Sequence, residues 1–395
     1  MKKTNWKALF CLMLIACAYT WQLDRPLLWG DEAGTAIFGR SILRNSVPVG
    51  FDGRNLAVFG NCSAVSKSLL SKKIPWVQYY TAALSLSLFG ESTRGARLLF
   101  ALIGVAAFFP LRAVLRKKSR YPELITTIVL LSPQVILFHR NARYYAMVTL
   151  LFAFLLWTYS HKFESRRRHM FFASLCAVLF FHTHQLAAFC SLTAMLVFCL
   201  LSDRKTLRIY LTALITGFIF WFLFFLSMEG VQGKSGTIAT LAFKNPSKWF
   251  SFFVSGLKAG VLDLDYVNCV PLLAWGMVMI VALWTKNKRN AALDTLRTPI
   301  CQIILINIAF QLVVNAAVLG FESQYHYSFL RYMPHLVAAG MIPLFLMVEK
   351  LVTAEPLVSE KGERRRASGR CVPTRGVGTR CCPFQKRPGR RCETA

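Results

Sequence analysis

Long apolar runs recur along this chain, and they constrain its fold more than any other feature. Each run approaches the ~20 residues that an α-helix needs to cross a bilayer, and basic clusters separate them. A soluble domain of 395 residues that is 55% hydrophobic would not repeat runs of this length. The sequence therefore predicts an all-α, multi-pass integral membrane protein with about 10 transmembrane helices. The predicted spans are 6–23, 97–115, 122–139, 144–160, 169–183, 185–201, 208–227, 266–284, 298–319 and 333–352.

The net charge of +29 does not indicate a nucleic-acid partner, because the basic residues lie between the apolar runs and in the tail. With ten spans, the clusters around Lys2, Arg116, Arg166, Arg204 and Lys286 fall on one side, which the positive-inside rule assigns to the cytoplasm. Both termini are then inside.

The first outer loop, 24–94, is far too long for a simple connector. "DEAGTAIFGRSILRN" predicts an interfacial helix with Asp31 as its N-cap. "IPWVQYYTAALSLSLFG" predicts a second one that begins at Pro75. Residues 1–352 would form the membrane domain, and 353–395 a basic cytoplasmic tail that is either disordered or an atypical end of the reading frame.

Charged residues are scarce in the middle of the predicted spans and frequent at their outer ends. A carboxylate there can take a proton from an attacking hydroxyl, and arginines match phosphate oxygens in charge and geometry. Asp31, Glu32 and Asp52 are the carboxylates of interest, and His182 and His184 could line the same site. Each also has a simpler interpretation: a solvated helix start for the acidic pair, and a polar turn between spans for the two histidines.

An exception is a polar stripe in the predicted span 298–319, formed by Asn307, Gln311 and Asn315 at helical spacing. Hydrogen bonding between helices accounts for it most simply, and a central transport cavity is the alternative.

Five stretches, in order, resemble the GT-C glycosyltransferases, in the branch that contains protein O-mannosyltransferases and lipid A aminoarabinose transferases. They are "WGDEA" (29–33), "LFGESTRGARLLFALIG" (88–104), "SPQVILFHRNARYYAMVTLLFAFLLW" (132–157), "FHTHQLAAF" (181–189) and "FLRYMPHLVAA" (329–339). Their order and spacing carry the resemblance, which covers roughly residues 5 to 350.

The resemblance implies transfer of a sugar from a polyprenyl-phosphate donor to an acceptor hydroxyl on the outer face, with inversion. Asp31 would be the base, and Glu32 would support either that base or the acceptor. The donor phosphate would be bound by a set of four residues: Arg97, Arg143, Tyr144 and Arg331. The acceptor would be a glycan, a lipid or a protein, and the membrane a bacterial plasma membrane with the site facing outward.

Two departures from the family matter. Many relatives carry an acidic or histidine residue before a Pro-Pro at the second interfacial helix, where some bind a metal, whereas this chain has "SKKIPW". The sequence therefore does not decide whether the protein uses a divalent cation. The chain also lacks the large soluble domain of some relatives, so it does not define the acceptor. A flippase or transporter of lipid-linked sugars is the alternative function, and a noncatalytic scaffold explains the spans but not the outer polar residues.

Overall fold

The computed structural model describes residues 5–56, 65–66, 68–71, 76–161, 163–227, 246–247, 250–251, 254, 276–283, 286–319 and 334–353. The chain divides into two units, Met1–Ala354 and Glu355–Ala395, and the described residues all belong to the first. Of the predicted span 266–284 the structure describes 276–283, which are helical, and of the predicted tail it describes residue 353 alone.

The described residues form helices joined by short turns, with three isolated β-bridges in the first loop. The helices before residue 120 are α1 (Trp6–Thr20), α2 (Gly30–Asn45), α3 (Val77–Phe89), α4 (Thr93–Ala106) and α5 (Phe108–Leu115). Those that follow are α6 (Pro122–Leu130), α7 (Pro133–His139), α8 (Tyr145–Ser160), α9 (Arg166–Thr183), α10 (Gln185–Ser202) and α11 (Arg204–Ser227). The last are α15 (Lys286–Leu296), α16 (Pro299–Leu319) and α18 (Pro334–Thr353).

Helices occupy nearly all of the predicted spans, but not every helix is long and apolar enough to cross a bilayer. Three described stretches are long and apolar enough to cross a bilayer: Thr93–Leu115, Gln185–Ser202 and Arg204–Leu226. The number rises to five if the bent pairs α6–α7 and α15–α16 each count as one span. These helices make the chain an all-α, multi-pass integral membrane protein, while the predicted total of about ten spans is not confirmed.

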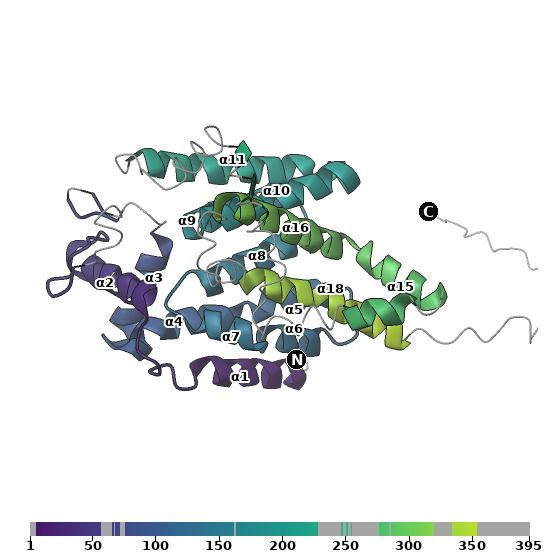
Figure 1. The fold of residues 1–395 in the computed structure, drawn as a ribbon, viewed down its shortest axis with the longest axis horizontal. Coiled ribbons are helices and arrows are strands. Elements are labelled where there is room, and N and C mark those ends of the chain that lie inside the picture. Colours follow the sequence, from purple (N-terminus) through teal and green to yellow (C-terminus); the bar gives the residue numbers. More distant parts are fainter. Residues whose placement is uncertain are drawn as a thin grey trace, which may run out of the picture. The chain divides into compact units, whose positions relative to one another are not determined.

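The basic turn that follows α5 contacts the ends of two other helices. Lys117 Nζ donates to the Ser160 carbonyl at the end of α8 at 2.7 Å, and the Arg120 N–H donates to Glu349 Oε1 near the end of α18 at 2.7 Å. The ends of α5, α8 and α18 therefore meet, as the alternation of spans requires. The helices α2 and α3 lie beside each other, away from these turns (Figure 1).

The helices α2 and α3 contact each other closely through small residues. A Cβ on Gly39 of α2 would come within 2.9 Å of the Ala82 Cβ of α3. Phe38 and Ile42 are buried in this contact, and the rings of Phe38 and Tyr79 lie 4.6 Å apart. The apolar face that the sequence assigned to the membrane interface is therefore used largely for packing against α3.

A buried hydrogen-bond network sets the bend between α6 and α7, which is 66°. Pro133 starts α7 and has no N–H to continue the ladder of α6. The Tyr19 hydroxyl donates to the Leu130 carbonyl at 2.8 Å and hydrogen-bonds His139 Nδ1 at 3.0 Å. His139 Nε2 in turn lies 2.8 Å from the Thr149 hydroxyl of α8. These bonds hold the turn between α7 and α8, which carries Arg143.

Candidate active site

Glu32 and Arg97 form a buried ion pair between α2 and α4. Arg97 Nε donates to Glu32 Oε1 at 2.8 Å, and Arg97 Nη2 donates to Oε2 at 2.6 Å. The remaining N–H groups of Arg97 go to the carbonyls of Leu23, Pro26 and Leu27. All five N–H donors of the guanidinium therefore bond to the protein itself. Arg97 thus fixes the segment that leads from α1 into α2.

The Glu32 carboxylate accepts two further hydrogen bonds, from backbone N–H groups. The Ala142 N–H in the turn between α7 and α8 donates to Oε1 at 2.7 Å, and the Trp29 N–H donates to Oε2 at 3.4 Å. Glu32 is fully buried, so these bonds and the Arg97 cation compensate the loss of water around its charge. Three stretches of the family resemblance, at 29–33, 88–104 and 132–157, meet at this one carboxylate.

The neighbouring carboxylate, Asp31, is partly open to its surroundings. Its Oδ2 lies 3.3 Å from Nη2 of Arg143, and its side chain is 27% exposed whereas that of Arg143 is 9% exposed. The N-cap of α2 is Trp29, so Asp31 lies in the first turn and is not itself the predicted N-cap. The positive end of the helix dipole still favours the ionised carboxylate at this position.

Arg143 lies among aromatic residues. Its guanidinium carbon is 5.1 Å from the centre of the Tyr144 ring, which in turn lies 4.5 Å from the His184 ring. Burial lowers the pKa of Arg143, but the hydroxyls of the neighbouring tyrosines and the Asp31 carboxylate raise it by more, so the net change is upward. Arg143 is therefore a charged guanidinium, and its Nε is buried without a hydrogen-bond partner.

His184 and His182 have separate environments, because α9 ends between them. His184 Nδ1 accepts the Ala187 N–H at 3.1 Å and caps α10. Burial and the nearby Arg143 charge lower the pKa of His184 to about 4, so its imidazole is neutral at pH 7. His182 lies in the last turn of α9, with its ring 5.3 Å from that of Phe224.

Asp52 stabilises the first loop. It pairs with Arg40 at 2.6 Å and accepts the backbone N–H groups of Arg54 and Asn55. Burial raises the pKa of Asp52, but these hydrogen bonds and the Arg40 charge lower it by more. Arg331 lies outside the described residues. Among the residues that the structure does describe, no group of three or more His, Cys, Asp or Glu side chains could hold a metal ion.

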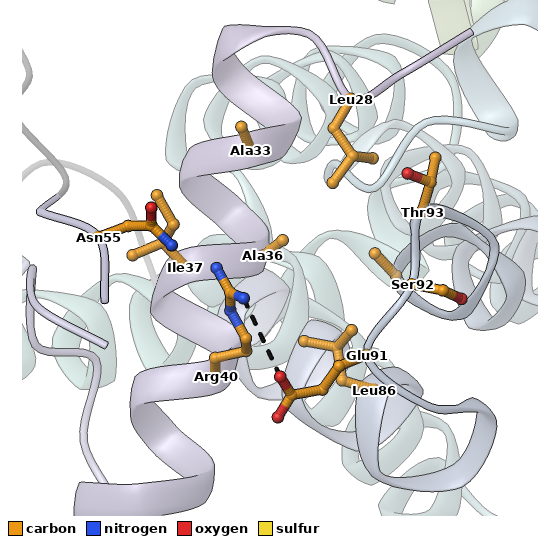
Figure 2. A pocket seen from close by; sticks show the side chains of 11 residues that line it. Leu28, Ala33, Ala36, Ile37, Arg40, Asn55, Leu86, Glu91, Ser92 and Thr93 are labelled. Atoms are coloured by element: carbon orange, nitrogen blue, oxygen red, sulfur yellow. Dashed lines mark ion pairs between the residues drawn. The ribbon is translucent and has the colours of Figure 1, made fainter. Parts of the chain in front are cut away.

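A cavity of about 310 Å³ lies beside α2 (Figure 2), and neither Asp31 nor Arg143 lines it. Its polar rim includes Arg40 and Glu91, which form a loose ion pair at 4.0 Å. Alanine, leucine and isoleucine side chains make up six of its eleven lining residues. The full lining is Leu28, Ala33, Ala36, Ile37, Arg40, Asn55, Leu86, Glu91, Ser92, Thr93 and Ala96.

Sequence reasoning missed Tyr79 of α3, which lies beside the Asp31–Arg143 pair. Burial raises the pKa of the Tyr79 hydroxyl, and the Asp31 charge adds to this rise, while a hydrogen bond with Ser71 and the charge of Arg143 lower the pKa. No sequence signal indicated this placement, because Tyr79 is one of several aromatic residues in the predicted interfacial helix. The contribution of the Ala142 N–H was equally invisible, since a backbone group carries no residue-specific signature.

No protein-family model matches the chain, and no curated protein matches it. Among solved structures, the chain is similar to the crystal structure of ArnT from Cupriavidus metallidurans bound to undecaprenyl phosphate. The sequences are 14% identical over 89% of this chain and 77% of that chain, with a TM-score of 0.46. ArnT is a lipid A aminoarabinose transferase of the GT-C group. This likeness by itself assigns no role to any residue.

Proposed function

We propose that the chain is an integral membrane glycosyltransferase that moves a sugar from a polyprenyl-phosphate donor to an acceptor hydroxyl on the outer face of the membrane. One observation carries the proposal: Arg143 is a buried cation with an unpartnered Nε–H, and it lies 3.3 Å from the partly exposed carboxylate of Asp31. A buried N–H without a partner is costly unless a ligand accepts it. A phosphate oxygen is the acceptor that best matches a guanidinium.

The proposed reaction uses these two side chains directly. Asp31 takes the proton from the acceptor hydroxyl, and the oxygen attacks the anomeric carbon of the donor sugar. The bond between that carbon and the phosphate oxygen breaks, and the electron pair leaves with the polyprenyl phosphate. Arg143 stabilises the charge that develops on this phosphate. Attack from the side opposite the phosphate inverts the anomeric centre.

The other predicted site residues have supporting roles in this proposal. Glu32 and Arg97 position Asp31 and Arg143, because their hydrogen bonds join α2, α4 and the turn between α7 and α8. Arg97 would bind phosphate directly only by giving up bonds to the protein, so we assign it to positioning. Tyr144 packs between Arg143 and His184 and orients the guanidinium.

Further features of the proposal come from the sequence alone. Arg331 would be a second cation for the donor phosphate, and a divalent cation could share in neutralising it, which a chelator would test through loss of transfer. The acceptor would be a glycan, a lipid or a protein, and the protein would lie in a bacterial plasma membrane with its site outward.

The test is sugar transfer by the purified protein in lipid. Radiolabelled polyprenyl-phosphate sugars are supplied with a membrane glycolipid extract, and new labelled products are resolved. We expect Asp31→Asn to lose about 10²–10⁴-fold in rate, which is the usual contribution of a general base. Arg143→Gln should lose about 10²–10³-fold, as expected for a group that stabilises developing charge.

The matched control is Asp294→Asn, the same substitution at a carboxylate that is 74% exposed on α15. Its rate should equal that of the wild type. If Asp31→Asn retains more than a tenth of the wild-type rate in folded protein, Asp31 is not the base. If label crosses the bilayer unchanged and equally in both variants, the protein is a flippase of lipid-linked sugars instead.

A further inference from the structure

Two residues of the polar stripe of α16, Asn307 and Gln311, form a buried cluster with His335 of α18. Asn307 and Gln311 lie one turn apart on the same face of α16 and are fully buried, and His335 is 1% exposed. His335 Nε2 lies 3.2 Å from Gln311 Oε1. Because an amide oxygen only accepts hydrogen bonds, His335 Nε2 is the donor and its Nδ1 is a bare acceptor. This bond is the interhelical contact that the sequence predicted for the stripe.

The single bond leaves most of the polar atoms in the cluster without partners. Both amide atoms of Asn307, the Nε2 of Gln311 and the Nδ1 of His335 are buried and make no hydrogen bond. Native proteins rarely leave such atoms unpaired, and in a membrane protein no bulk water reaches them. Unpaired amides are also less stable there than leucine would be. A cluster of this kind is expected to bind something polar.

The chemistry of the cluster selects the kind of ligand. It offers amide N–H donors from Asn307 and Gln311 and acceptors from Asn307 and His335, in close proximity. The three side chains provide no carboxylate and no arginine or lysine, so the cluster does not match a phosphate or a metal ion. Hydroxyl groups, which both donate and accept, match it well.

The cluster is close to the candidate active site. His335 lies within electrostatic range of His184, and the His184 ring contacts the Tyr144 ring beside Arg143. The ring of Phe152 in α8 is 6.0 Å from that of His335. The charged side chains of Asp31 and Arg143 thus lie near the neutral hydrogen-bonding groups of the cluster. This arrangement suits a ligand in which a phosphate is joined to a sugar.

We propose that Asn307, Gln311 and His335 bind hydroxyl groups of the donor sugar and determine which sugar the protein accepts. The proposal rests on the glycosyltransferase function above, because the donor phosphate would lie at Arg143. A site built to hydrogen-bond hydroxyl groups discriminates strongly against ligands that lack them, since its polar atoms then stay unpaired.

The test measures lipid binding to the full chain in nanodiscs. The probes are polyprenyl phosphate without a sugar and a panel of polyprenyl phosphates bearing mannose, glucose or an arabinose. The wild type should bind at least one sugar-bearing lipid about tenfold more tightly than the bare lipid, which corresponds to roughly one net hydrogen bond. Asn307→Leu should lose this preference and keep its affinity for the bare lipid.

Two further variants and a control separate the possible outcomes. Gln311→Leu repeats the test if Asn307→Leu fails to fold, and Arg143→Gln should weaken both kinds of lipid equally. Asn290→Leu makes the same substitution at an exposed residue of α15 and should retain the preference.

Each contrary outcome has a definite meaning. If Asn307→Leu keeps the tenfold preference, the cluster binds internal water and the inference fails. If the wild type prefers no sugar in the panel, the inference fails while donor-phosphate binding stands. If no polyprenyl phosphate binds at all, the proposed function itself fails.

Discussion

Two adjacent carboxylates, Asp31 and Glu32, provide the sharpest test of the structure, because it gives them different roles. Glu32→Gln and Asp31→Asn are both isosteric changes from a carboxylate to an amide. The first removes the charge that compensates buried Arg97, and the second weakens the 3.3 Å ion pair between Arg143 and a partly exposed carboxylate. We expect the first to impair folding and the second to impair chemistry.

The expected magnitudes follow from burial and bonding. Breaking a buried ion pair by neutralising one partner costs about 3–5 kcal/mol of unfolding free energy. Glu32 also accepts the Ala142 N–H at 2.7 Å, which places Glu32→Gln in the upper part of that range. Asp31→Asn should cost less, about 1–2 kcal/mol, because its pair with buried Arg143 is long at 3.3 Å, the Asp31 side chain is 27% exposed, and an amide oxygen can still accept from Arg143. The difference of about 2–3 kcal/mol is roughly a thirty- to hundredfold change in the folding equilibrium.

The assay is equilibrium unfolding by SDS titration in mixed micelles, with transfer activity measured on the same preparations. Glu32→Gln should unfold at clearly lower SDS, and Asp31→Asn close to the wild type but without activity. Adding Arg97→Met to Glu32→Gln should restore part of the stability, because the unpaired cation is then gone. Recovery should be partial, since the carbonyls that Arg97 binds lose their donor. Equal losses of stability in the two single variants would refute this division of roles.

Three further predictions concern pH, packing and the bend. His184 has a pKa of about 4 in the folded protein and about 6.5 when unfolded, so its contribution to stability is complete above pH 6.5 and is lost as pH falls toward 4. Between pH 7 and pH 5, the free energy of unfolding should therefore fall less in His184→Asn, which retains a helix cap, than in the wild type. Gly39→Val should lower the free energy of unfolding by about 1–3 kcal/mol, since the valine side chain would collide with Ala82. A thermal melt like that of the wild type would instead show that α2 and α3 can separate freely. Tyr19→Phe should lower the free energy of unfolding by about 1–3 kcal/mol, measured by SDS titration, because the Leu130 carbonyl loses its donor. An unchanged midpoint would mean that this bond does not hold the bend between α6 and α7.

The sequence by itself determined the membrane class and most of the helix positions. Apolar runs of spanning length admit few structures in a bilayer, because every backbone N–H must be bonded within its own segment. The prolines at positions 122, 133, 299 and 334 stand at helix starts, because the first turn of a helix needs no N–H from them and their fixed φ already suits a helix. The order of the matched stretches also singled out Asp31, Arg97 and Arg143 as residues of interest, although it could not distinguish their roles.

Only the tertiary structure decided which carboxylate is buried and which is open. Asp31 and Glu32 are neighbours in sequence, but they lie about 100° apart around α2, and what each one contacts depends on α4 and the turn between α7 and α8. The Ala142 N–H that binds Glu32 is 110 residues away along the chain, and such a pairing leaves no periodic trace. The unpaired atoms of Asn307 and His335 likewise follow from how α16 and α18 pack. Local patterns fix helices through short-range sterics and hydrogen bonding, whereas the environment of a side chain is set by segments that meet only in the folded protein.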